Sequence, residues 1–149
     1  MKALIVIDIQ KGYIEKYDKD LLTRVNQRIQ YAAAHEELII YVKNTKKLRN
    51  GVQTNELAQD LNVCSAYILC KKNASAFSND ELLNILRQEQ VTEVEIIGVD
   101  GNSCIANSAA DAKKHGYKVV LPCQCIGVQN RQRFEISKHY LREKGIMLI

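Results

Sequence analysis

The sequence has no tryptophan, a single proline and no long apolar run. Its first apolar stretch, ALIVI (3–7), is followed at once by Asp8 and is too short to span a membrane. No small-residue cleavage site follows, as a secretory signal would require. Pro122 ends an apolar run, and no linker-like segment divides the chain. We therefore expect one domain over residues 1–149, located in the cytoplasm, with no membrane partner.

Aromatic residues and excess charge of one sign are also scarce. The chain has seven Tyr, two Phe and a net charge of +4, and its lysine pairs are scattered along the sequence. Proteins that bind nucleic acid normally gather basic residues on one face. The basic residues here are typical of a solvated surface, and we expect no nucleic-acid partner.

Histidine is limited to three residues, and the cysteines form no regular pattern. The five cysteines are Cys64, Cys70, Cys104, Cys123 and Cys125. The only close pair is C-x-C, with no second pair and no well-spaced histidines to complete a zinc site. We therefore expect free thiols in a reducing compartment, most of them packing residues, and no metal or other cofactor.

What the sequence does contain is a regular alternation of predicted strands and helices. Apolar or β-branched runs predict strands at 3–8, 37–44, 66–71, 94–99, 118–123 and 146–149. Helical spacing predicts helices at 21–34, 55–61, 78–88, 103–115 and 131–145, with a polar stretch at 46–53. This alternation predicts an α/β fold: a Rossmann-like three-layer αβα domain with a mostly parallel sheet of about six strands.

Ligands of open α/β sheets bind at the carboxyl ends of the strands, and polar residues stand at several of these ends. Asp8 and Gln10 follow the first strand, Lys71 ends the third, and Cys104 follows the turn after the fourth. Each has an ordinary alternative: Asp8 as a cap, Lys71 as solvated surface, Cys104 as packing. Together they favour a carboxylate, an ammonium and a thiol at one edge of the sheet.

A histidine partner for Cys104 does not fit the predicted elements. His115 lies eleven residues along the same predicted helix, about 16 Å away, and the other two histidines fall near helix ends outside the cluster. The remaining means of activating the thiol are the positive helix end, a nearby cation and a carboxylate base. Lys71 and Asp8 supply the last two.

Three segments carry a resemblance to a known family. VIDIQKGYI (6–14) resembles a first-strand D-x-Q segment followed by an aromatic, a place that Tyr13 fills. KKNASAF (71–77) resembles K-x-x-x-[SG]-A-F, and counting back from Phe77 selects Lys71 rather than Lys72. GVDGNSCIANSAADAKKHGYKVV (98–120) resembles G-V-x-x-x-x-C-V-x-x-[ST]-x-x-D-A-x-x-x-G-Y. These segments are similar, in this order, to those of the isochorismatase-like cysteine hydrolases, which include nicotinamidases and N-carbamoylsarcosine amidase.

The resemblance implies a Rossmann-like fold and a catalytic triad of Asp8, Lys71 and Cys104. The cysteine would attack an amide-type carbon, Asp8 would move the proton, and water would hydrolyse the thioester. The N–H groups of Asp100 and Cys104 would stabilise the oxyanion, next to a cis peptide at Val99–Asp100. Gln10, Tyr13 and Phe77 become candidates for the substrate pocket, and a homo-oligomer, dimeric or tetrameric, is expected.

The chain departs from the family pattern in three places. Metal-binding members carry a D-x-H pair after the second strand, whereas YVKNTKKLRN (41–50) has neither residue type. Asp100 and Gly101 replace residues that are more often Ala or Thr, and a carboxylate near the thiol raises its pKa unless it points away. The chain is also short between strands two and three and near its carboxyl end.

Three functions are compatible with this pattern. The first is a metal-independent cysteine hydrolase of a small amide-like substrate. The second is a non-catalytic small-molecule-binding subunit, or pseudoenzyme, on the same fold, suggested by Asp100 and the shortened pocket region. The third is a nucleotide-binding protein, but Gly98 and Gly101 have no third glycine in register for G-x-G-x-x-G.

Overall fold

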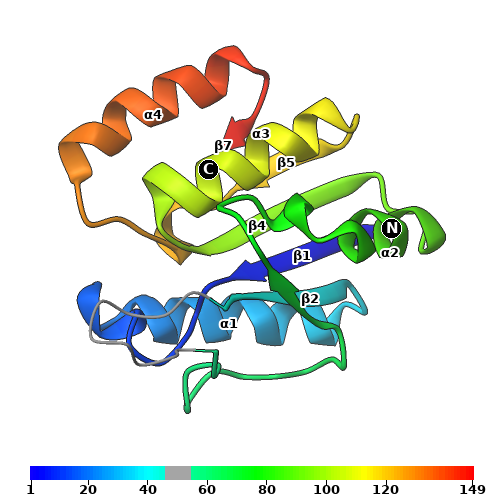
Figure 1. The fold of residues 1–149 in the computed structure, drawn as a ribbon, viewed down its shortest axis with the longest axis horizontal. Helices are drawn as coiled ribbons and strands as arrows, with labels where there is room; N and C mark the ends of the chain where they lie inside the picture. Colours follow the sequence, from blue (N-terminus) through cyan, green and yellow to red (C-terminus); the bar gives the residue numbers. More distant parts are fainter. Residues whose placement is uncertain (46–54) are drawn as a thin grey trace.

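Seven strands form one sheet in the computed structural model, which describes residues 1–45 and 55–149 (Figure 1). The strands are β1 (Lys2–Ile7), β2 (Leu38–Asn44), β3 (Ile68–Lys71), β4 (Glu93–Val99), β5 (Lys118–Leu121), β6 (Ile126–Gly127) and β7 (Met147–Leu148). Their order is β3-β2-β1-β4-β5-β7, with β6 beside β4, and every pair is parallel. The predicted fold class is confirmed, with the two-residue β6 as the strand that the sequence did not indicate.

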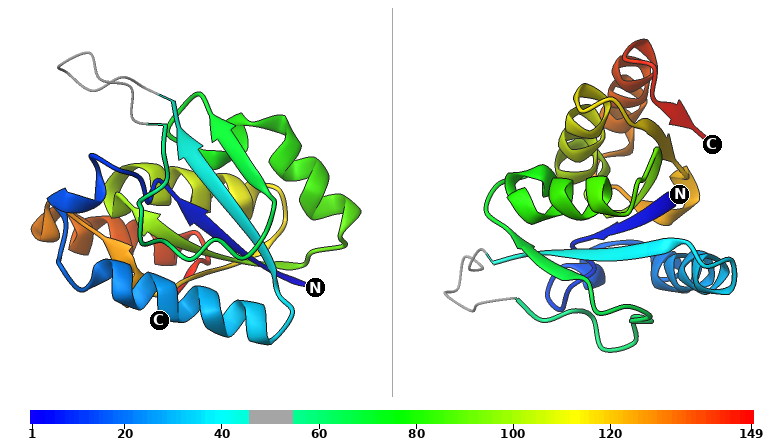
Figure 2. Two further views of the ribbon diagram at one scale, coloured as in Figure 1. Left: turned by 90° about the horizontal axis from the view of Figure 1, so that it is seen from below. Right: turned by 90° about the vertical axis from the view of Figure 1, so that its right-hand side faces the viewer.

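Helices cover both faces of this sheet. They are α1 (Leu21–Ala34), α2 (Asp80–Gln88), α3 (Ala106–Lys114) and α4 (Arg131–Glu143). The side chains of α1 pack on one face, and those of α2, α3 and α4 pack on the other (Figures 1 and 2). In the described ranges no helix combines the length and apolar character needed to cross a membrane.

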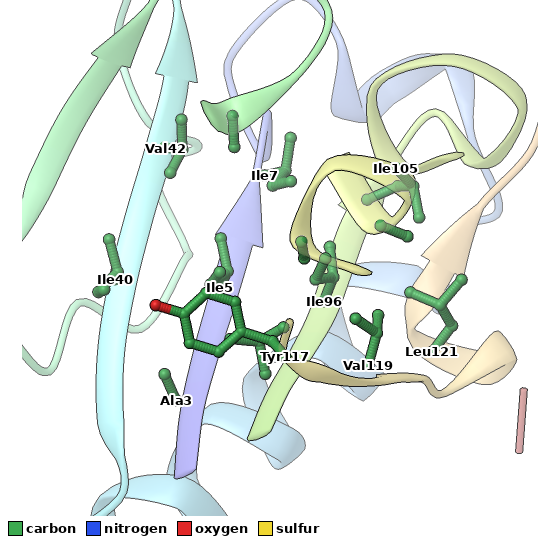
Figure 3. Packing of buried hydrophobic residues seen from close by; sticks show 14 of the residues in the cluster. Ala3, Ile5, Ile7, Ile40, Val42, Ile96, Ile105, Tyr117, Val119 and Leu121 are labelled. Atoms are coloured by element: carbon green, nitrogen blue, oxygen red, sulfur yellow. The ribbon is translucent and has the colours of Figure 1, made fainter. Parts of the chain in front are cut away.

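Side chains of the central strands alternate between the two faces of the sheet and form a hydrophobic core on each face. In β1, Ala3, Ile5 and Ile7 belong to the core on the side of α2, α3 and α4. Figure 3 shows their side chains among others of that core. Leu4 and Val6 point to the other face, toward α1. Because both faces are covered, these strands read as continuous apolar runs.

The predicted helix at 55–61 is wrong. This segment is irregular and packs Ala58 and Leu61 into the α1-side core. Its backbone bonds to the chain after β1: Ala58 N–H donates to Ile9 (2.9 Å), and Leu57 forms an antiparallel bridge with Gln10. These partners across the fold replace the bonds a helix would make within itself. The predicted polar stretch at 46–53 lies outside the described residues.

The carboxyl edge of the sheet is tightest where β4 passes β1. Gly98 has a φ of +123°, and a Cβ there would lie 2.0 Å from the carbonyl oxygen of Ile7. Only glycine permits this approach. The close contact places the turn after β4 beside the residue that follows Ile7.

Candidate active site

Asp8 is the first residue beyond β1. Its N–H donates to the carbonyl of Val42 (2.9 Å), and its φ of 56° lies in the left-handed region, which aspartate tolerates better than most residues. This conformation turns the chain at the strand end. The side chain is buried, with a carboxylate oxygen, Oδ2, 3.1 Å from the ammonium of Lys71.

Lys71 lies between the carboxylate and the thiol. It ends β3, is fully buried, and reaches past the end of β2, which separates β3 from β1. Its Nζ lies 3.1 Å from Asp8 Oδ2 and donates to Cys104 Sγ at 3.2 Å. It also donates to the carbonyls of Asn73 (3.2 Å) and Ala74 (3.1 Å). A buried lysine needs such partners to keep its charge.

The loop after β3 presents those two carbonyls through serine contacts that the sequence analysis did not single out. Ser78 Oγ accepts from the N–H groups of Lys72 (3.3 Å) and Asn73 (3.2 Å). Ser108 Oγ, on α3, accepts from Ala76 N–H at 2.8 Å. These contacts hold residues 72–78 in place around the lysine ammonium.

Cys104 lies in a wide turn, Gly101–Ile105, that joins β4 to α3. The expected helix at 103–115 thus begins as this turn, with Ile105 N–H donating to Asp100 O (3.1 Å), five residues back. The peptide before it, Val99–Asp100, is cis. The thiol is partly exposed, and its pKa is raised, first by burial and then by the charge of Asp8, against the opposing effect of Lys71.

The carboxylate of Asp100 is held by donors of its own. Its Oδ2 accepts from Asn102 N–H (2.9 Å) and its Oδ1 from Gln129 N–H (3.0 Å). Burial raises the pKa of the Tyr17 hydroxyl. The charge of Asp100, and the hydrogen bond between Tyr17 and Asp100, raise that pKa further. Asp100 is therefore a cap of the Cys104 turn.

A pocket of about 210 Å³ is lined by Asp8 and Cys104. Its lining comes from three regions: the end of β1 with the following turn, the end of β2, and the loops after β4 and β6. The lining residues are Asp8, Tyr13, Lys16, Tyr17, Asn44, Val99, Asp100, Ser103, Cys104 and Gln129. The pocket is smaller than the roughly 300–1,000 Å³ of sites for drug-sized ligands, so it suits a small molecule.

Of the three predicted pocket residues, only Tyr13 lines it. Gln10 is fully buried and braces β1 against β2: its Nε2 donates to Asn44 O (2.9 Å), and its Oε1 accepts from Asn44 N–H (2.7 Å). The ring of Phe77 packs on the ring of His115, with centroids 5.3 Å apart. Both residues support the site from outside its lining, since their partners are the neighbouring strand end and the end of α3.

Sequence reasoning missed several lining residues, among them Lys16, Tyr17, Asn44, Ser103 and Gln129. Asn44 ends β2, so the strand-end argument would have found it. Gln129 follows β6, a strand too short to recognise. Lys16 and Tyr17 belong to the turn that leads from β1 to α1, where no periodic pattern marks them.

A larger cavity, of about 570 Å³, lies elsewhere, between α1, β6 and α4. Leu21, Arg24, Ile126 and Phe134 are among its lining residues. None of Asp8, Lys71 and Cys104 lines it, so we place the candidate site in the smaller pocket.

Metal-binding members of the family that the sequence resembles carry a D-x-H pair after the second strand. Among residues 1–45 and 55–149, no group of three or more His, Cys, Asp or Glu side chains is arranged to hold a metal ion. The segment where a D-x-H pair would be expected, 41–50, runs partly outside the described residues. In the described part, the donor set does not fit such an ion.

Similarity to known proteins extends over nearly the whole chain. Residues 2–149 match the family described as Isochorismatase domain. The uncharacterized isochorismatase family protein YaaI of Bacillus subtilis is 27% identical over 155 residues, which cover 91% of this chain and 86% of that protein. Maleamate amidohydrolase of Pseudomonas putida is 28% identical over 121 residues, covering 76% of this chain but 55% of the relative.

Solved structures show the same fold. The pyrazinamidase of Pyrococcus horikoshii in complex with zinc has a TM-score of 0.87 at 22% identity, covering 99% of this chain and 98% of that one. N-carbamoylsarcosine amidase from Thermoplasma acidophilum has a TM-score of 0.86 at 19% identity, covering 99% and 94%. With the family match over nearly its whole length, the chain belongs to the isochorismatase family.

Proposed function

We propose that this protein is a metal-independent cysteine hydrolase that cleaves the C–N bond of a small amide-like substrate. The observation that carries the proposal is the position of Lys71 Nζ, 3.1 Å from Asp8 and 3.2 Å from Cys104, two residues that line a small pocket. Relatives named as a maleamate amidohydrolase and an N-carbamoylsarcosine amidase support a C–N bond as the target.

The resting state of the proposed triad follows from its charges. The Asp8 carboxylate and the Lys71 ammonium form a buried ion pair, and the raised pKa of Cys104 keeps the thiol protonated at neutral pH. A carboxylate base beside a protonated thiol is suited to accept its proton when sulfur attacks a carbonyl carbon. Lys71 holds both groups in position.

The reaction then has two halves. Sulfur bonds to the carbonyl carbon while Asp8 takes the thiol proton, and the N–H groups of Asp100 and Cys104 stabilise the oxyanion. Asp8 returns that proton to the leaving nitrogen as the C–N bond breaks, which leaves a thioester on Cys104. Water, deprotonated by Asp8, attacks the thioester carbon, and the C–S bond breaks to release a carboxylic acid and restore the thiol.

A screen of small primary amides tests this function through release of ammonia. Mass spectrometry of quenched reactions should show the acyl group on the peptide that contains Cys104. Asp8→Asn and Cys104→Ala should lower turnover by about a thousandfold or more. Cys70→Ser, which changes an exposed cysteine on β3, is the matched control and should keep wild-type turnover.

Undiminished hydrolysis by Asp8→Asn would rule out the proposed mechanism. If no amide is hydrolysed and Cys104 carries no acyl group, the alternative is favoured: a non-catalytic binding subunit. The raised pKa of Cys104 supports this alternative, because a protonated thiol is less nucleophilic than a thiolate.

Two further proposals concern the setting of the protein. We propose a reducing, cytoplasmic location, supported by five free thiols, of which Cys64 and Cys70 are exposed. We also propose a homo-oligomer. Exposed apolar side chains on α4, Ile136 and Tyr140, are consistent with a contact between subunits.

A further inference from the structure

The charged residues that line the pocket differ in how many ion-pair or hydrogen-bond partners they have. Asp8 pairs with Lys71, and both carboxylate oxygens of Asp100 accept backbone hydrogen bonds. Among the described residues that line the pocket, Lys16, in the turn between β1 and α1, is the one that is cationic. Lys71 is fully buried beneath the lining, with its ammonium surrounded by four partners.

Lys16 has no ion pair in the part of the chain that the structure describes. Its ammonium lies 5.8 Å from the ring centroid of Tyr13, which also lines the pocket, and the lysine side chain is exposed. Residues 46–54, outside the described ranges, contain no Asp or Glu. A lysine that is exposed, lines a pocket and has no carboxylate partner among the described residues is available to bind an anionic group of a ligand.

Asp100 is the competing feature, because a carboxylate in the lining suits a cationic substrate instead. Its two oxygens, however, already accept from Asn102 and Gln129, and Tyr17 bonds to it as well. Three of the roughly four acceptor sites of this carboxylate are thus occupied, which leaves about one for a ligand. The difference between the two residues favours a negatively charged substrate.

We propose that Lys16 selects small amides that carry a carboxylate or similar anionic group a few atoms from the scissile bond. The proposal rests on the proposed function. Lys16 and Cys104 line the same pocket, so a substrate with its amide carbon at Cys104 can present an anionic group to Lys16. A volume of about 210 Å³ equals roughly seven water molecules at liquid density, so both groups belong to one short molecule.

A chemical probe tests the charge preference without requiring turnover. Iodoacetate and iodoacetamide both alkylate a thiolate with loss of iodide, and they differ by one negative charge. We would measure both rates at Cys104 by peptide mass spectrometry, in low salt, and take the ratio of iodoacetate to iodoacetamide. Lys16→Gln should lower this ratio about three- to tenfold, and Lys16→Arg should restore most of it.

Lys19→Gln is the matched control, because Lys19 is an exposed lysine three residues along the chain and does not line the pocket. It should leave the ratio at the wild-type value. The same variants would then be assayed with monoamides of short dicarboxylic acids and with the corresponding neutral diamides. Lys16→Gln should raise KM for the monoamides relative to the diamides by about the same factor.

The outcomes separate this inference from the proposed function. An unchanged alkylation ratio in Lys16→Gln, with amide hydrolysis that depends on Cys104, overturns the role of Lys16 and leaves the hydrolase standing. A changed ratio with no hydrolysis of any amide supports an anion-selective pocket and counts against the hydrolase. Equal effects of Lys16→Gln and Lys19→Gln would show a general surface charge effect and would also overturn the inference.

Discussion

At the scale of single residues, the site is a balance of buried charges. Lys71 neutralises Asp8 and donates to the sulfur, while burial and Asp8 oppose ionisation of Cys104. The Cys104 thiol thus lies between a carboxylate and an ammonium, with its pKa raised. This arrangement differs from a thiolate activated by a histidine, for which the chain has no suitably placed residue.

The pH dependence of Cys104 alkylation follows from this balance. Asp8 raises the pKa of the thiol, so Asp8→Asn should lower that pKa. At pH 8 the variant should then react faster with iodoacetamide than wild type. Alkylation rates between pH 6 and 10 measure the shift, with exposed Cys70 as an internal control.

The opposite result is equally informative. If the profile of Cys104 moves upward or stays in place in Asp8→Asn, the charge of Asp8 does not act on the thiol. The proposed proton transfer between them would then lack its basis.

At the scale of elements, β4 runs very close to β1. This close approach sets the distance between the turn that carries Cys104 and the residue after β1, Asp8. Gly98 allows that approach, and Gln10 links the end of β1 to the end of β2. The side chain of Lys71 reaches from β3 to both Asp8 and Cys104. Each reactive side chain is thus positioned by a strand end.

Gly98→Ala tests this element-level constraint. A Cβ 2.0 Å from the carbonyl of Ile7 cannot be accommodated by a side-chain shift, so the variant should lose about 3 kcal/mol or more in the free energy of unfolding. Gly116→Ala is the control: it also has a positive φ, +92°, but open space around the added atom. It should cost only about 1 kcal/mol.

Urea unfolding of the three proteins gives the comparison. The difference between the two variants isolates the crowding from the backbone strain that they share. Similar losses in both would show that β1 moves away readily, contrary to the close packing at the site.

At the scale of the whole molecule, the candidate site and a network of ion pairs lie at opposite edges of the sheet. Arg28 of α1 makes a bidentate ion pair with Glu37, both contacts at 3.0 Å, and bonds to Glu95 at the start of β4. Lys2, at the start of β1, joins the same group through Glu37 (3.6 Å) and Glu95 (3.2 Å). This network ties α1 to the amino ends of the strands.

The network makes stability depend on acid pH. Burial acts to raise the pKa of Glu37, but hydrogen bonds and charge from Arg28 outweigh it and lower the pKa below its usual 4.5. Because the folded pKa is depressed, this contribution is present above about pH 4.5 and lost as pH falls through the folded value. Glu37→Gln should cost about 1–3 kcal/mol at pH 7 and much less at pH 3.

Free energies of unfolding in urea at the two pH values provide the measurement. Glu36→Gln, an exposed neighbour without an ion pair in the described ranges, should have little effect at either pH. A loss in Glu37→Gln that is the same at pH 7 and pH 3 would contradict the assigned ionisation.

Local patterns in the sequence determined most of the secondary structure. Periodicity within 21–34 and the apolar runs at 3–8, 37–44 and 94–99 match α1, β1, β2 and β4 to within a residue or two. Parallel strands carry their carboxyl ends to one edge, so the sequence alone predicts that Asp8, Lys71 and Cys104 lie together at that edge. These inferences hold because helix and strand spacing depend on near neighbours.

Only the tertiary structure decided what depends on partners far apart in the chain. Residues 55–61 are not helical because their backbone bonds to the chain after β1. Gln10 is a buried brace instead of a pocket residue because Asn44 lies opposite. The raised pKa of Cys104 and the exposure of Lys16 to the same pocket likewise follow from burial and charge in three dimensions, which residue spacing does not encode.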